Sequence, residues 1–240
     1  MSNKLVFPVP DEFRRGAFGG RKLVETGKQI LDLVCETAGI ESFDGLDILD
    51  YGSGYRMAQV LLEFDMEFAS YCGIDIDPEM MGWLQDHNPD PRMDFHLVPF
   101  QNELYRPEGE QMTGESQLPV GDNTYDVIMM FSVVTHLAPH DTRALFAILR
   151  RYLKPDGFLF FSTFVNPIME DPYSEGDPDK PLWMSIYQEA FLFDLLAETG
   201  WVCEHYAEPV GQMIQHQMLC RPTDDPNPPR PACRPGTPAY

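Results

Sequence analysis

Two short segments carry the residues most able to bind a ligand. Residues 46–54 (Leu-Asp-Ile-Leu-Asp-Tyr-Gly-Ser-Gly) form an apolar run that ends in Asp50 and breaks into a Gly-x-Gly turn. Residues 73–77 (Gly-Ile-Asp-Ile-Asp) form a second apolar run that ends in acid. An apolar strand, a tight glycine turn, a helix and a second acid-tipped strand are typical of the nucleotide-binding half of a doubly wound α/β fold. The pattern predicts a site for an adenosine-containing cofactor.

Each residue type in these segments suits a different part of such a ligand. Gly52 and Gly54 let the backbone come within contact distance, where a side chain would fill the space. A carboxylate at the end of the second strand can accept both hydroxyl protons of a ribose. We assign this role to Asp75, with a plain strand-end acid as the alternative. Asp77 precedes Pro78 and is better interpreted as the N-cap of the next helix.

Hydrophobic periodicity predicts the elements that must position these residues. An irregular N-terminal arm, which could act as a lid, is expected over residues 1–20, and the main domain over residues 21–220. Residues 221–240 are rich in proline and are expected to form a disordered tail. The expected strands lie at about residues 46–50, 70–75, 93–98, 125–132, 158–164, 201–207 and 212–219, the expected loops at 99–124 and 166–181, and a late helix at 184–199.

Composition limits the class of protein. The 240 residues, 43% of them hydrophobic, are most simply one globular domain. The first residues lack a signal-peptide core, and no apolar run is long enough to span a membrane, so a cytoplasmic protein is expected. The five cysteines are scattered without a Cys-x-x-Cys pair. They therefore predict neither a disulfide framework nor a zinc site, and no metal site is assigned.

The chain is strongly acidic, with a formal net charge of −21 and a pI near 4.4. Nucleic acids and anionic membranes are disfavoured as partners, because both attract Lys and Arg. The charge is interpreted mainly as keeping the protein soluble. The alternative interpretation is that it attracts cationic ligands. It leaves the oligomeric state open.

Four motifs together resemble the class I S-adenosylmethionine-dependent methyltransferases. They are Asp50-Tyr-Gly-Ser-Gly54, Gly73-Ile-Asp-Ile-Asp-Pro-Glu-Met80, the run from Tyr125 to Leu137, and Leu153-Lys-Pro-Asp-Gly157, in the order that the family uses. Within the family the chain is similar to bacterial small-molecule methyltransferases, through Gly19-Gly20, Arg56-Met-Ala58 and Asn102…Tyr105-Arg-Pro-Glu-Gly109. The resemblance covers roughly residues 16–220. It implies an α/β, Rossmann-like doubly wound sheet of seven strands in the order 3-2-1-4-5-7-6, with the last strand antiparallel.

The resemblance also implies a set of contacts with S-adenosylmethionine. Asp50 would lie near the ammonium of the methionine portion, with helix capping as its alternative role. The backbone near Phe131 and Ser132, at the end of the fourth strand, would lie against the cofactor. The full set of expected cofactor residues is Asp50, Gly52, Ser53, Gly54, Arg56, Asp75, Ile76, Phe100, Asn102, Phe131 and Ser132.

The sequence departs from the family pattern at two points. Gly54 is followed directly by Tyr55 and Arg56, so the glycine loop is one residue short. The acid that often ends the third strand and reaches the adenine is replaced around Pro99, which shifts the expected adenine contacts to Phe100 and Asn102. The third glycine of a dehydrogenase fingerprint is absent, which argues against NAD.

His136 is the candidate general base, because histidine titrates near neutrality without large perturbation. Its alternative role is structural, tying the fourth strand to the next helix. A sulfonium methyl is already activated, so the protein would mainly align nucleophile, methyl carbon and sulfur. The expected substrate residues are Phe18, Tyr173, Trp183 and Tyr187.

Two other functions stay open at this point. One is a non-catalytic cofactor-binding or scaffold protein with the same fold, which the shortened loop favours. The other is a nicotinamide oxidoreductase, which the incomplete fingerprint disfavours. The acceptor atom for a methyl group (O, N, C or S) is not specified by the sequence.

Overall fold

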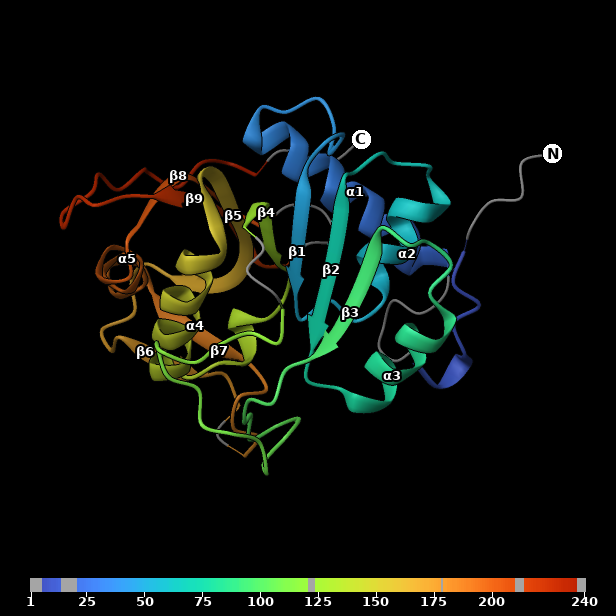
Figure 1. Ribbon diagram of the computed structural model, residues 1–240. Coiled ribbons are helices and arrows are strands. Elements are labelled where there is room, and N and C mark those ends of the chain that lie inside the picture. The colour runs from blue at the N-terminus through green and yellow to red at the C-terminus, as the bar shows by residue number, and fades with distance from the viewer. Residues whose placement is uncertain (1–5, 14–20, 121–123, 178, 210–213, 237–240) are drawn as a thin grey trace.

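The computed structural model describes residues 6–13, 21–120, 124–177, 179–209 and 214–236 (Figure 1). Its strands are β1 (Asp47–Tyr51), β2 (Ser70–Asp75), β3 (Met93–Leu97), β4 (Tyr125–Met130), β5 (Leu153–Asn166), β6 (Tyr173–Glu175), β7 (Ser185–Gln188), β8 (Trp201–Ala207) and β9 (His216–Pro222). Its α-helices are α1 (Arg21–Ala38), α2 (Arg56–Glu63), α3 (Pro78–His87), α4 (Pro139–Tyr152) and α5 (Glu189–Glu198). Short 3₁₀ turns, η1 (Asp11–Phe13) and η2 (Val134–His136), precede α1 and α4.

The central sheet has the order β3-β2-β1-β4-β5-β9-β8. Strands β1 to β5 pair in parallel, and β9 runs antiparallel to both β5 and β8. Numbered along the chain, these seven strands have the order 3-2-1-4-5-7-6, so the predicted Rossmann-like fold is confirmed. Because the parallel strands point the same way, the ends of β1, β2 and β4 meet at one edge, at the bottom of Figure 1.

Helices cover both faces of the sheet, and β4 shows why its sequence is almost continuously apolar. Ile128 and Met130 belong to the core cluster that contains residues of α4 and α5. Val127 and Met129 belong to the opposite cluster, which contains residues of α1, α2 and α3. A central parallel strand is buried on both sides, so its sequence does not alternate with polar residues.

A hairpin after β5 departs from the sequence prediction. Residues 166–181 are predicted as loop and residues 184–199 as helix, but β6 and β7 pair antiparallel there, and β7 adds to the long strand β5. Helix α5 therefore begins only at Glu189, where the side chain of Gln188 caps the backbone N–H of Phe191. The hairpin places its connecting loop beside the carboxyl edge of the sheet.

The described part of the N-terminal arm is packed against the domain. Phe7, Val9 and Phe13 are buried, and the ring of Phe7 meets Phe95 edge-on at 5.7 Å. The backbone N–H of Phe7 donates to Gln59 Oε1 at 3.1 Å. Phe7, Val9 and Phe13 thus belong to the core on the face covered by α1 to α3. Residues 14–20 of the predicted arm lie outside the described residues.

The tail also departs from the prediction, which gave a disordered segment over residues 221–240. Strand β9 includes the first two of these residues, and the chain then runs along the outer strand β8. The N–H of Arg234 donates to Tyr206 O and the N–H of Glu208 donates to Arg234 O, both at 2.9 Å. Arg230 forms an ion pair with Asp194 of α5. The described tail is ordered because it supplies hydrogen bonds to the outer side of β8, which has no other strand beside it.

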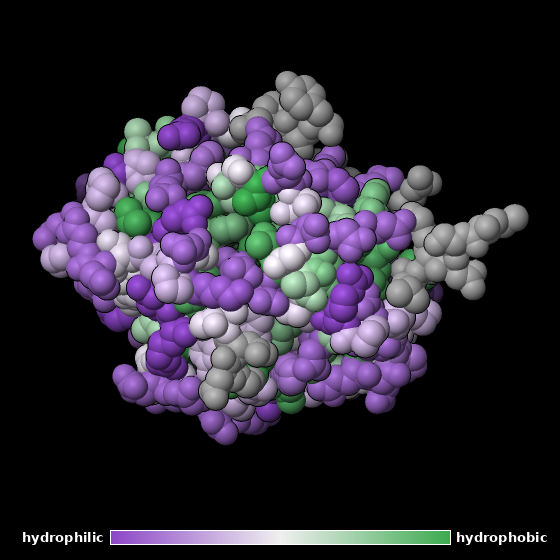
Figure 2. Space-filling view, turned by 45° about the horizontal axis from the view of Figure 1, so that its top comes forward, coloured by the Kyte–Doolittle hydropathy of each residue, from purple (hydrophilic) through white to green (hydrophobic). Residues whose placement is uncertain are grey.

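The surface reflects the acidic composition. Hydrophilic residues cover most of the face seen in Figure 2, and hydrophobic residues show there only in small separate areas. Among the described residues no helix is both long and apolar enough to cross a membrane.

Removal of the tail should destabilise the domain. A chain ending at Pro222 loses the backbone bonds of Arg234 and exposes the edge of β8, at a cost on the order of 1–2 kcal/mol. We expect the melting temperature to fall by about 2–8 °C in a thermal scan. Arg230→Ala is the matched control, because one exposed ion pair contributes about 1 kcal/mol at most. A truncated chain that melts with the full-length protein would contradict the packed tail.

Candidate functional site

The turn between β1 and α2 has the conformation that its glycines predict. Gly52 and Gly54 have φ angles of +73° and +48°, which residues with a side chain rarely adopt. A Cβ atom on Gly52 would lie 2.4 Å from Cγ2 of Val133. The N–H groups of Gly52 and Ser53 both donate to Ile74 O, at 2.7 and 3.1 Å. The turn is therefore fixed to the end of β2, with its backbone open to close approach.

Asp75 is joined directly to this turn. Its carboxylate accepts hydrogen bonds from the N–H groups of Gly54 (2.9 Å), Ile76 (2.7 Å) and Asp77 (3.1 Å). Burial raises the pKa of Asp75, and the three amides oppose that shift. A carboxylate has about four lone-pair sites, so three amides leave it capacity for a further donor. The two predicted segments thus meet at one place.

Asp77 caps helix α3, as the sequence predicts. Its side chain accepts from the N–H groups of Glu79 and Met80, both at 3.0 Å, and Pro78 occupies the first helical position. The two acids of the Asp-Ile-Asp motif therefore have separate roles. Only Asp75 faces the glycine turn.

Asp50 is deeply buried beneath the turn. Its carboxylate accepts a hydrogen bond of 2.7 Å from the hydroxyl of Tyr71, and burial raises its pKa to about 7. The helix-capping alternative is not found, since α2 has Tyr55 at its N-cap position and no side-chain cap. A buried carboxyl with one neutral donor is ready to accept a cationic partner.

The shortened loop brings Arg56 to the first position of α2, where its side chain turns toward α1. The guanidinium donates to Leu23 O (3.2 Å) and Thr26 Oγ1 (2.6 Å). It also lies 5.5 Å from the ring centroid of Phe131. Arg56 therefore fastens α1 to the ends of β1 and β4, next to the expected cofactor site.

Ser132 follows β4 and has a φ angle of +63°, which is unusual for a residue other than glycine. Its N–H donates to Ser162 Oγ at 2.9 Å, and its hydroxyl accepts from Gln215 Nε2 at 2.8 Å. The chain turns sharply here, so that Val133 covers Gly52. The predicted neighbours of the cofactor on β1 and β4 are therefore in contact.

Asn102 and His136 join three segments at the same edge. The amide of Asn102 donates to His136 O (2.9 Å), while its side-chain oxygen accepts from the N–H groups of Leu104 and Tyr105. The His136 ring hydrogen-bonds through Nδ1 to Leu182 O at 2.9 Å and meets the ring of Tyr105 edge-on. Asn102 therefore organises the loop after β3, and His136 ties the segment after β4 to the hairpin loop instead of the predicted tie to the next helix.

Burial lowers the pKa of His136, and the nearby carbonyls of Leu182 and Trp183 oppose the shift. The imidazole is therefore neutral at pH 7, and Nδ1 carries the proton that the carbonyl oxygen accepts. A neutral ring in this tautomer has its Nε2 lone pair available to accept a proton.

The expected substrate residues separate into three groups. Trp183 is 54% exposed on the hairpin, and Tyr173 is half-buried with its hydroxyl 3.1 Å from Ser185 Oγ. Tyr187 has no exposed surface. Its hydroxyl donates to Leu137 O and contacts Thr142 Oγ1, both at 2.7 Å. The prediction that Tyr187 lines a substrate pocket is therefore wrong. Phe18 lies outside the described residues.

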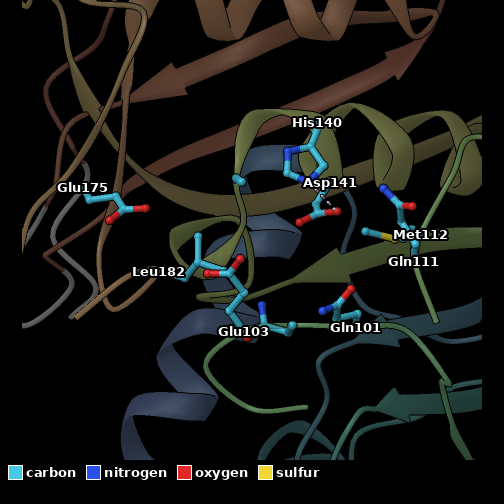
Figure 3. Close-up of a pocket in the computed structure, with 10 residues that line it drawn as sticks. Gln101, Glu103, Gln111, Met112, His140, Asp141, Glu175 and Leu182 are labelled. Atoms are coloured by element: carbon cyan, nitrogen blue, oxygen red, sulfur yellow. Dashed lines mark ion pairs between the residues drawn. The ribbon is translucent and has the colours of Figure 1, made fainter. Parts of the chain in front are cut away.

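A cavity of about 140 Å³ lies beside Asn102, between the loop after β3, the start of α4 and the hairpin. The carboxylates of Glu103, Asp141 and Glu175 point into this space (Figure 3). Burial raises the pKa of Asp141, an effect that nearby Glu103 reinforces and His140 opposes. The sequence analysis did not predict this cavity, because its acids come from three segments far apart in the chain.

The described residues contain no group of three or more His, Cys, Asp or Glu side chains that could hold a metal ion.

Phe100 is buried, and its carbonyl lies close to Gly109, where a Cβ would come within 2.4 Å. The loop after β3 is thus folded tightly on itself at this point.

Comparison with known sequences decides the family. The sequence profile of the methyltransferase domain matches residues 23–206, which include the glycine turn, Asp75 and the end of β4. The chain belongs to this family. The match confirms the resemblance to class I S-adenosylmethionine-dependent methyltransferases, and S-adenosylmethionine is the cofactor to which the site must be compared.

Solved structures share the fold of this methyltransferase at low sequence identity. The PH0226 protein from Pyrococcus horikoshii OT3 has a TM-score of 0.59 and 16% identity, covering 90% of this chain and 100% of its own. The glycopeptide N-methyltransferase MtfA, complexed with S-adenosyl-L-homocysteine, has a TM-score of 0.57 and 12% identity, with 82% and 90% covered. Magnesium protoporphyrin IX methyltransferase from Synechocystis PCC 6803, with bound S-adenosylmethionine, has a TM-score of 0.55 and 16% identity, with 88% and 89% covered.

The burial of Asp50 gives the ligand-free methyltransferase a defined pH response. Its pKa is raised in the folded state, so its contribution to stability is complete only below pH 3.8 and is lost as pH rises through about 7. Asp50→Asn cannot ionise, so its melting temperature relative to wild type should increase between pH 5 and pH 8. Asp86→Asn, at an exposed position of α3, is the matched control. A flat difference for Asp50→Asn across this range would mean that Asp50 is not buried as a carboxylic acid.

Proposed function

We propose that the protein transfers a methyl group from S-adenosylmethionine to a nucleophilic atom of a small molecule. The observation that carries the proposal is the hydrogen bond from the Gly54 N–H to the Asp75 carboxylate. This bond joins the glycine turn, whose backbone could contact a cofactor, to an acid that could accept hydrogen bonds from a ribose. Both lie at the carboxyl edge of the sheet of a methyltransferase domain.

The residues at this edge fit the cofactor in three respects. Val133 occupies the space beside Gly52, whereas a Cβ at Gly54 would have only Met80 Sδ within 4 Å, at 3.7 Å, which leaves room for a ligand against the backbone there. Asp75 has remaining acceptor capacity for ribose hydroxyls. Asp50 is a buried acid without a cationic hydrogen-bond partner among the described residues, which suits the ammonium of a methionine portion. Ser53, Ile76 and the backbone near Phe131 complete the proposed cofactor set.

The proposed mechanism depends on alignment. The sulfonium supplies an activated methyl group, and the protein holds an acceptor in line behind it. Orientation of this kind can contribute about 7–11 kcal/mol to lowering the barrier. The loops around the site are fixed by hydrogen bonds of Ser132, His136 and Arg56, as alignment of the two reactants requires.

His136 could add a general base to alignment. The proposal is supported by its neutral ring and by the bond that holds Nδ1 to Leu182 O. A positioned base contributes about 10²–10⁴-fold in rate. The structural tie alone requires only the Nδ1 bond, so the two roles predict different pH profiles.

A small-molecule substrate is supported by the neighbourhood of the site. The cavity beside Asn102 has room for part of a small molecule, and its three carboxylates disfavour phosphate-bearing polymers. The glycopeptide N-methyltransferase and the protoporphyrin methyltransferase named above have the same fold. Tyr173, Trp183 and the arm with Phe18 are proposed to border the acceptor site. A cytoplasmic location fits the acidic, mainly hydrophilic surface.

Substitution of Asp75, which ends β2, and of Asp77, which follows it, tests cofactor binding. Asp75→Ala removes the proposed ribose acceptor, and one lost charge-assisted bond costs about 1.5–3 kcal/mol. We expect affinity for S-adenosylhomocysteine, measured by titration calorimetry, to fall by about 10-fold or more. Asp77→Ala is the matched control, since it should lose about 1 kcal/mol of stability as a helix cap but keep its affinity.

Three results would contradict this proposal. Equal affinity in Asp75→Ala and wild type would place the ribose elsewhere. Binding of NAD, without a response to S-adenosylmethionine or S-adenosylhomocysteine, would indicate an oxidoreductase. Cofactor binding with no labelled product from a broad panel of small molecules, incubated with methyl-labelled S-adenosylmethionine, would favour a scaffold protein.

The role of His136 can be separated with the acceptor found in that panel. If His136 is a base, the methyl-transfer rate of wild type should fall as the pH drops through the lowered pKa of His136, because protonation blocks Nε2. His136→Gln should then be slower by about 10²-fold at pH 7.5 and lose that pH dependence. A variant that keeps the wild-type rate and profile would leave His136 only its structural tie.

A further inference from the structure

Three polar side chains form a closed ring beneath the end of β4. The N–H of Ser132 donates to Ser162 Oγ (2.9 Å), the Ser162 hydroxyl donates to Gln215 Oε1 (2.6 Å), and Gln215 Nε2 donates to Ser132 Oγ (2.8 Å). Ser162 is completely buried on β5, and Gln215 precedes β9. The ring therefore joins three segments that are far apart in the chain.

The ring surrounds a strained residue. Ser132 has a φ angle of +63°, where the Cβ atom of an L-residue crowds its own backbone. Such a conformation persists only where the surroundings hold it, and it is often found at functional sites. Here one hydrogen bond holds the backbone of Ser132 and another holds its hydroxyl, so both ends of the residue are fixed.

The bend at Ser132 decides where its two neighbours lie. Val133 covers Gly52 so closely that a Cβ there would be 2.4 Å from Val133 Cγ2. On the other side of the bend, the ring of Phe131 lies 5.5 Å from the guanidinium carbon of Arg56. A relaxed backbone at Ser132 would move both contacts, and with them the cradle formed by the glycine turn.

We propose that Ser162 and Gln215 are positioning residues, which hold Ser132 in its left-handed conformation and thereby seat the segment after β4 on the cofactor cradle. The inference rests on the proposed function, since it assumes that the cradle binds S-adenosylmethionine. It assigns a role in cofactor binding to Gln215, which lies outside the motifs found in the sequence and acts through Ser132.

A purely structural ring would behave differently. Buried polar groups in a satisfied network stabilise a fold whether or not a ligand binds. Its loss would lower the melting temperature and leave the affinity of the folded fraction unchanged. Loss of a positioning ring must instead weaken cofactor binding. This effect must disappear when residue 132 can adopt its left-handed conformation without being held.

The experiment measures S-adenosylhomocysteine affinity by titration calorimetry on the full chain. Gln215→Leu removes both of its bonds in the ring and should weaken binding by about 10-fold. Glycine adopts positive φ without being held, so the effect of Gln215→Leu is measured again in a Ser132→Gly background. There Gln215→Leu should change affinity by less than about 3-fold relative to Ser132→Gly alone.

A second variant and a control complete the test. Ser162→Ala removes one atom of the ring and should weaken binding in the same direction, which keeps the test available if Gln215→Leu does not fold. Gln117→Leu, at an exposed position before β4, should bind like wild type. Unchanged affinity in both ring variants would overturn the proposal, as would a Gln215→Leu effect that is just as large in the Ser132→Gly background. Wild type that fails to bind S-adenosylhomocysteine would instead refute the proposed function.

Discussion

The hydrogen bond from the Gly54 N–H to the Asp75 carboxylate is the interaction on which the site depends. It connects the turn after β1 to the end of β2, where Ile74 O already accepts from Gly52 and Ser53. A buried carboxylate without donors is costly, and three backbone amides compensate for that cost here. The same bonds hold the glycine turn in its conformation. A change at Asp75 therefore also changes the shape of the cradle.

The loops at the carboxyl edge are held by side chains that bond to distant backbone. Asn102 reaches His136 O, His136 reaches Leu182 O, and the ring at Ser132 joins the end of β4 to β5 and to the residue before β9. Each tie fixes a segment that has no regular hydrogen-bond ladder of its own. A methyl transfer that relies on alignment needs such fixed surroundings, because orientation is lost when the loops move independently.

Electrostatics gives the site a preference for positive charge. Burial raises the pKa values of both Asp50 and Asp75 in the ligand-free protein. A ligand that carries an ammonium group and donates from hydroxyls would favour the ionised form of both acids. Cofactor binding and ionisation should therefore be coupled, most visibly near pH 7, where Asp50 titrates. The net charge of −21 acts in the same direction over longer distances.

The sequence by itself determined the glycine turn and the place of Asp75, because a buried strand, a tight turn and a helix cap each leave a local signal. The sheet order came from the resemblance of the motifs to a known family. The tertiary structure alone decided features that depend on partners distant in the chain. Tyr187 looks like a pocket aromatic but is buried, since Leu137 O accepts from its hydroxyl. The proline-rich tail looks disordered, yet Arg234 pairs with Tyr206 at the free edge of β8. Local composition cannot report such contacts, because the groups that satisfy them are supplied by other elements of the fold.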